Sequence, residues 1–150
     1  MVAEQISRVI RFSPVKHWVL TTSRRTPAGF AERVRQNIFN QNLKLNIFSW
    51  RDTTDHWLSE QLGRACCAWI TEDSVSMVYE ALTARIPVGL LAVPPRRHDR
   101  VVRGVRKLVS TSSIRTFKDW CEGHPLSRPE HVYDEANRVA EQICDHWGSR

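Results

Sequence analysis

Two short polar segments contain the residues whose types and spacing are best suited to binding an anion. Residues 21–27 read TTSRRTP and residues 71–81 read TEDSVSMVYEA, and each follows an apolar, strand-like run and precedes a helical pattern. A helix start favours phosphate, because its first N–H groups lack partners within the helix and the helix dipole is positive there. The candidate phosphate-binding residues are Thr22, Ser23, Arg24, Arg25, Thr26, Asp73, Ser74 and Ser76.

The second segment also provides a carboxylate that suits a ribose. Asp73, Ser76 and Glu80 share one face at helical spacing. Glu80 lies about 10 Å along the axis from the helix start, and helical side chains lean back toward the N-terminus. A diphosphate at the helix start would place its ribose near Glu80, the candidate ribose-binding residue. The alternative is that Asp73 only caps the helix, Glu80 is solvated, and the two arginines face water or pair with a nearby Asp.

The elements around these segments alternate between helices and strands. Strands are predicted at residues 17–22, 43–48, 66–71, 88–93 and 113–117. Helices are predicted at residues 2–12, 27–40 (with Thr26 as N-cap), 56–64, 74–84, 97–109 and 132–147. This order is typical of an α/β, three-layer, Rossmann-like domain with a mainly parallel sheet of four or five strands. Ligands bind such sheets at the carboxyl ends of the strands, so we expect both polar segments at the same edge.

The composition is that of one globular domain with a basic surface. The chain has 150 residues, a net charge of +6 and a pI of about 9.6. Most of the positive charge is arginine, whose forked guanidinium group matches phosphate, although a solvated basic surface would explain the excess equally well. A basic cluster at residues 96–107 would suit nucleic acid, an anionic membrane, another domain or plain solvent. No nucleic-acid-binding motif accompanies it, so nucleic acid is the least favoured partner.

Other classes of site receive little support. The cysteines show neither a CxxC pair nor zinc-finger spacing, and we expect reduced, structural thiols and no metal site; they are Cys66, Cys67, Cys121 and Cys144. No glycine lies between Thr21 and Ala28, so the GxGxxG fingerprint of NAD binding is absent. The apolar runs are too short to cross a bilayer and the N-terminus lacks a signal-peptide pattern, so we expect a cytoplasmic protein. The pattern identifies no catalytic residue.

The motifs TTSRRTP and TEDSVSMVYEA, followed by PVGLL, resemble the C-terminal half of the plant mitochondrial-fission, elongated-mitochondria family over residues 16–110. Many bacterial members of that family are predicted to be nucleoside-diphosphate-sugar epimerases. The second motif is also similar to the TDSGG…EE…PV segment of UDP-N-acetylglucosamine 2-epimerases and, more loosely, to GT-B glycosyltransferases. The resemblance implies a GT-B-like nucleotide-sugar domain in which Asp73, Ser74 and Ser76 hold the diphosphate and Glu80 holds the ribose.

The chain departs from the epimerase pattern at two places, and it is short. Val75 and Ser76 replace glycines, which narrows the approach of the backbone to a phosphate. Arg85 stands where a glycine often closes the helix, and a left-handed non-glycine residue costs about 1 kcal/mol. GT-B enzymes close a cleft between two domains. The resemblance therefore implies that this chain is the C-terminal part of a longer two-domain protein, completed by a missing N-terminal domain or by a second copy.

Three functions remain open at this point. The first is binding of a UDP-sugar or another nucleoside diphosphate, with no permanently bound cofactor, in an epimerase or glycosyltransferase-like protein. The second is a non-enzymatic interaction module that keeps the GT-B-like fold and binds a partner through its surface. The third is binding of nucleic acid through the basic segment at residues 96–107.

Overall fold

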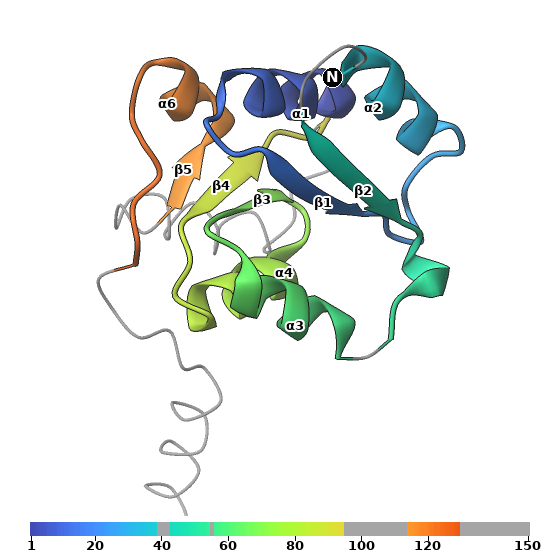
Figure 1. Ribbon diagram of the computed structural model, residues 1–150. Helices are drawn as coiled ribbons and strands as arrows, with labels where there is room; N and C mark the ends of the chain where they lie inside the picture. Colours follow the sequence, from blue (N-terminus) through green and yellow to red (C-terminus); the bar gives the residue numbers. More distant parts are fainter. Residues whose placement is uncertain (39–42, 55, 95–113, 130–150) are drawn as a thin grey trace, which may run out of the picture.

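Parallel β-strands form the centre of the domain in the computed structural model, which describes residues 1–38, 43–54, 56–94 and 114–129 (Figure 1). The described strands are β1 (His17–Thr21), β2 (Lys44–Phe48), β3 (Ala68–Thr71), β4 (Val88–Leu91) and β5 (Ile114–Thr116). β1 pairs with β2, and β4 pairs with β3 on one side and β5 on the other. Every one of these pairs is parallel, as the alternation of strands and helices predicts.

Helices cover both faces of the strands, which confirms the three-layer α/β architecture. The described helices are α1 (Val2–Phe12), α2 (Phe30–Ile38), η1 (Trp50–Asp52), α3 (Trp57–Arg64), α4 (Val75–Thr83) and α6 (Phe117–Cys121). Figure 1 shows α1, α2 and α6 above the strands and α3 and α4 below them. No helix in the described ranges is long and apolar enough to cross a membrane.

The core consists of two apolar clusters, one for each sheet. On the β1–β2 side, Val34 and Ile38 of α2 are buried against Ile10 of α1. On the β3–β4–β5 side, α4 contributes Val78, Ala81 and Leu82, none of which is exposed to solvent. These residues recur at the three- and four-residue spacing of a helix face, so each helix buries one apolar side against the strands.

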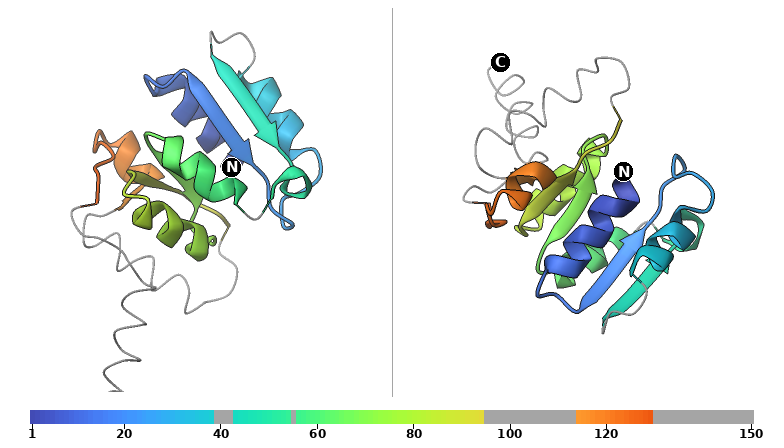
Figure 2. Two further views of the ribbon diagram at one scale, coloured as in Figure 1. Left: turned by 60° about the horizontal axis from the view of Figure 1, so that its bottom comes forward. Right: turned by 90° about the horizontal axis from the view of Figure 1, so that it is seen from above.

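The expected single sheet is divided in two. Within the described strands β1 does not pair with β3, and the two strands lie on opposite sides of a cleft. Helix α1 joins the two sheets instead, because it packs against α2 and also reaches the chain after β4 (Figure 2). The buried Gln5 side chain donates to the Ala92 carbonyl at 2.8 Å and accepts from the Ala92 N–H at 2.9 Å.

The predicted start of the second helix is wrong. Helix α2 begins at Phe30, not at Pro27, because Gly29 has a φ of 73°, which no helical residue adopts. Thr26 does not cap the helix. Its Oγ1 atom accepts a hydrogen bond from the Ser23 N–H at 2.8 Å and so closes the preceding turn.

Three other differences are local. Strand β3 begins at Ala68, so Cys66 is exposed and is not the buried start of the strand. Helix α6 was not predicted, although Thr116 and Asp119 form a capping box, a pattern visible in the sequence. The predicted helices at 97–109 and 132–147, the basic segment and Cys144 lie outside the described residues.

Candidate functional site

The two predicted polar segments lie together at the carboxyl ends of β1 and β3. Arg25, in the loop after β1, forms an ion pair with Asp73, in the loop after β3, with 3.0 Å between Nη1 and Oδ2. The two side chains are 56% and 39% exposed, so the pair lies at the surface and its contribution to stability is small. Its value is geometric, since it shows that residues 48 positions apart in the sequence reach the same site. The alternative that an arginine pairs with a nearby Asp is thereby realised for Arg25.

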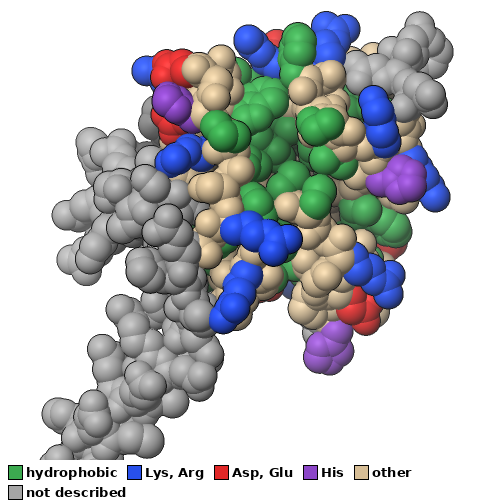
Figure 3. Space-filling model, turned by 60° about the vertical axis from the view of Figure 1, so that its left-hand side comes forward, with side chains coloured by type: hydrophobic (Ala, Val, Ile, Leu, Met, Phe, Trp, Pro, Cys, Tyr) green, Lys and Arg blue, Asp and Glu red, His purple; other side chains and the backbone are tan. Residues whose placement is uncertain are grey.

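A cleft of about 600 Å³ lies beside this ion pair, between β1 and β3. Six of the predicted phosphate-binding residues line it, namely Thr22, Ser23, Arg25, Thr26, Asp73 and Ser74. Apolar side chains of α1 and α3 line its interior, among them Ile6 and Leu58. Figure 3 shows one face of the molecule, on which hydrophobic side chains gather in the middle and Lys and Arg side chains lie around them. A hydroxyl-lined rim above an apolar interior is typical of a small-molecule site.

The other three predicted site residues lie outside this cleft. Arg24 lies over the ring of Trp50, with its Cζ atom 5.1 Å from the ring centroid. Ser76 and Glu80 are exposed on α4 and are not among the residues that line the cleft. A ligand that contacts Glu80 would therefore have to extend out of the cleft along α4.

The start of α4 keeps its first N–H groups available to a ligand. Ser74 is the N-cap residue, but its side chain makes no capping bond and instead lies 3.0 Å from the Thr71 hydroxyl. Asp73 precedes the cap, so the alternative in which Asp73 caps the helix is wrong. First-turn N–H groups without a capping side chain are the feature that favours an anion at a helix start.

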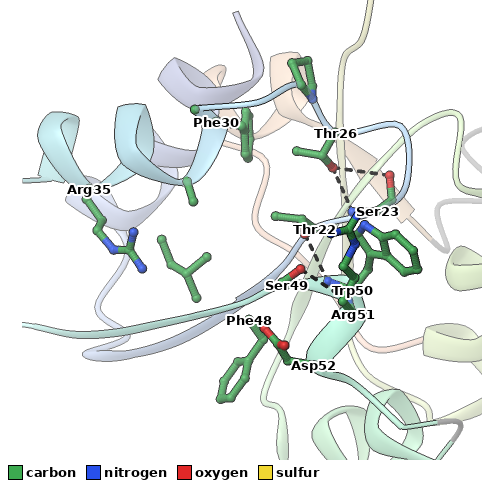
Figure 4. A pocket seen from close by; sticks show the side chains of 14 residues that line it. Thr22, Ser23, Thr26, Phe30, Arg35, Phe48, Ser49, Trp50, Arg51 and Asp52 are labelled. Atoms are coloured by element: carbon green, nitrogen blue, oxygen red, sulfur yellow. Dashed lines mark hydrogen bonds between the residues drawn. The ribbon is translucent and has the colours of Figure 1, made fainter.

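A second cavity, of about 400 Å³, lies on the other side of the loop after β1 (Figure 4). Thr22, Ser23 and Thr26 line both cavities, so this loop forms the wall between them. The far side of the second cavity is built by α2 and by the segment after β2, through Arg35, Ser49, Trp50, Arg51 and Asp52. These residues are not among the site residues predicted from the sequence. The signal that could have found them is Ser49 directly after an apolar strand, because the other two loops also carry hydroxyl residues close to a strand end.

Backbone hydrogen bonds fix the two loops that border the second cavity. The Trp50 N–H donates to Thr22 Oγ1 at 3.2 Å, which ties the loop after β2 to the loop after β1. Within the loop after β1, the Arg25 N–H donates to Ser23 Oγ at 3.2 Å. At the start of η1, the Arg51 N–H donates to Ser49 Oγ at 3.3 Å. The hydroxyl groups are thus held in place by the backbone.

The cysteine at the opposite end of the cleft is poorly suited to act as a nucleophile. Cys67 lines the cleft beside the start of β3. Burial raises the pKa of the Cys67 thiol to about 12, and the adjacent Cys66 adds to this effect. The reactive form of cysteine is the thiolate. Cys67 therefore remains a neutral thiol near pH 7.

The chain was compared with protein families, with curated proteins and with solved structures. The model of the family described as Mitochondrial fission ELM1 matches residues 1–147. This match is longer than the stretch of residues 16–110 over which the motifs resemble the family, and it confirms that resemblance. Neither the curated proteins nor the solved structures gave a match.

Proposed function

The chain belongs to the mitochondrial fission ELM1 family, and from this premise we propose that it binds a nucleoside diphosphate or a nucleoside-diphosphate sugar. The diphosphate lies at the loops after β1 and β3, with the phosphate next to the nucleoside at the start of α4. The observation that carries the proposal is the Arg25–Asp73 ion pair, because it brings both predicted segments to the rim of one cleft.

The chemistry of this rim suits a diphosphate. Hydroxyl groups of Thr22 and Ser74 and the first N–H groups of α4 donate hydrogen bonds to phosphate oxygens. Arg25 is already partly neutralised by Asp73, so it holds the two loops together and offers its remaining N–H groups to the ligand. Glu80, further along α4, accepts from the ribose hydroxyls. These residues bind and orient the ligand, and no catalytic role is assigned to any of them.

The first prediction is that nucleoside diphosphates stabilise the fold and that Glu80 binds the ribose. At a UDP concentration of 100 Kd, binding adds about 2.7 kcal/mol, which raises Tm by roughly 5–10 °C for a chain of this size. In Glu80→Ala we expect a smaller shift with UDP but an unchanged shift with pyrophosphate, which has no ribose. Differential scanning fluorimetry measures both shifts, and Glu60→Ala, which removes an exposed carboxylate from α3, is the control. If no nucleoside diphosphate moves Tm, the proposal is wrong.

A second candidate is a non-enzymatic interaction module. The family description concerns mitochondrial fission, which is a process of membrane division and not sugar chemistry, and this favours a role in binding a partner. Absence of any nucleotide response in the experiment above would select this candidate. For both candidates we also propose a cytoplasmic location. We further propose that another domain or a second copy of the chain completes the site.

A further inference from the structure

We infer that the second cavity, between the loops after β1 and β2, binds the distal phosphate and the sugar of the ligand. This inference rests on the proposed function. It specifies where the end of the ligand farthest from the nucleoside binds. The residues that it assigns are Ser49, Arg51 and Asp52, which line the cavity, and Arg24, which does not line it but lies over the ring of the lining residue Trp50.

The hydroxyl groups of Thr22 and Ser49 at this cavity are free to donate. The oxygens of Thr22, Ser49 and Ser23 each accept a hydrogen bond from a backbone N–H, as described above. A hydroxyl group that is already an acceptor still carries its own proton. One of the hydroxyl groups of Ser23 and Thr26 donates to the other at 3.3 Å, whereas Thr22 and Ser49 donate to no other group within the described part of the chain. A cluster of O–H donors without acceptors suits an anion.

The positively charged side chains beside this cavity also favour the distal phosphate of the ligand. Arg24 and Arg51 lie 5.1 and 5.3 Å from the centroid of the Trp50 ring. Neither forms an ion pair with any carboxylate of the described residues, whereas Arg25, on the cleft side, is paired with Asp73. Two like charges beside one ring repel each other, and a phosphate between them would relieve the repulsion and accept charge-assisted hydrogen bonds. Among the arginines of the loops after β1 and β2, the two without an ion pair therefore lie at Trp50, on the β2 side.

The rest of the cavity suits a sugar. Phe30, Phe48 and Asp52 are among the residues that line it (Figure 4). Asp52 is an exposed carboxylate that accepts hydrogen bonds from sugar hydroxyls, and apolar rings pack against the faces of a sugar. The volume of about 400 Å³ lies within the range of small-molecule pockets. The ligand class is thus a phosphate ester of a hydroxyl-rich molecule, with the nucleoside on the α4 side.

Isothermal titration calorimetry on the 150-residue chain at low ionic strength tests this assignment with UMP, UDP, UDP-glucose and pyrophosphate. In Arg51→Gln and in Arg24→Gln we expect the Kd for UDP and for pyrophosphate to rise at least about tenfold, with little change for UMP, which lacks the distal phosphate. In Asp52→Asn we expect a similar loss for UDP-glucose only. Arg11→Gln, an exposed arginine of α1 that lines neither cavity, is the matched control.

The outcomes separate this inference from the proposed function. If UDP binds but Arg51→Gln and Arg24→Gln bind it as tightly as the unmodified chain, the inference is wrong and the proposed function stands. If pyrophosphate binds in an Arg51-dependent way while UDP binds no better than pyrophosphate, the phosphate site stands and the nucleotide proposal fails. If none of the four ligands binds, both are wrong. All three substitutions are of exposed side chains, so circular dichroism should show an unchanged fold.

Discussion

Among the glycines of the described residues, Gly89 is the one at which an added methyl group would meet the closest neighbour. It is paired directly with Trp69 across β3 and β4, and a Cβ atom there would lie 2.4 Å from the Trp69 ring. The ring cannot easily move aside, because it packs edge-on against Trp120 at 5.5 Å and Phe117 at 6.4 Å between centroids. The absence of a side chain at Gly89 therefore allows the aromatic cluster to cover the sheet.

We expect Gly89→Ala to lower the free energy of unfolding by about 1–3 kcal/mol, since overpacking a buried site costs this much. Gly63→Ala is the control, because Gly63 lies within α3 and a Cβ atom there would meet nothing within 4 Å. That change should instead stabilise the chain by up to about 1 kcal/mol. Urea denaturation measures both values, and a Gly89→Ala chain as stable as the original would contradict the packing argument.

Helix α4, which presents the proposed phosphate site, ends in a strained residue. Arg85 follows the C-cap with a φ of 56°, as expected for the position where a glycine often closes this helix. The Ile86 N–H donates to the Ala81 carbonyl at 3.3 Å and the Arg85 N–H to the Leu82 carbonyl at 3.0 Å. These two bonds define a Schellman motif, in which the left-handed residue satisfies the last carbonyls of the helix.

At this element, Arg85→Gly should stabilise the chain by up to about 1 kcal/mol, because glycine adopts a positive φ without the steric cost of a Cβ atom. Ala84→Gly provides the comparison, since Ala84 has a helical φ of −71°. It should destabilise by a similar amount. Chemical denaturation of the two variants, one position apart, distinguishes relief of strain from a general effect of glycine, and equal shifts in the two would refute the strain.

At the scale of the whole molecule, one buried side chain links the two sheets. Gln5 is 6% exposed and makes both of its hydrogen bonds to the backbone of Ala92. Because β1 and β3 are not paired, α1 and this contact replace a strand ladder as a connection between the halves. The cleft between the sheets therefore depends on where α1 is held.

Gln5→Ala should lower the free energy of unfolding by about 1–2 kcal/mol, toward the smaller end for lost hydrogen bonds because water can reach the exposed Ala92. Hydrogen exchange should also show faster exchange at the Ala92 amide, whose acceptor is removed. Gln36→Ala, an exposed change on α2, should alter stability by less than about 0.5 kcal/mol. Unchanged exchange at Ala92 would show that Gln5 does not hold the two halves together.

The sequence by itself determined the order of the helices and strands from α1 to β4, apart from η1, together with the parallel pairing and the family. These follow from local patterns, because helical and strand periodicities are set by neighbours in the chain, and because strands joined by helices run parallel. It also predicted correctly that residues 21–27 and 71–81 reach one edge of the strands, since both follow a strand. The family followed from two motifs whose order and spacing can be read without a structure.

Only the tertiary structure determined which residues line the cleft and which line the second cavity. Arg24 contacts Trp50, whereas the adjacent Arg25 contacts Asp73. Which partner each arginine finds depends on the distant loop that lies beside it, and no local pattern encodes this. The same is true of the cavity after β2 and of the separation of β1 from β3, which arises where α1 contacts both halves. Residues far apart in the chain acquire partners only when packing fixes their distance. The elements were therefore predictable, whereas the partners of the charged side chains were not.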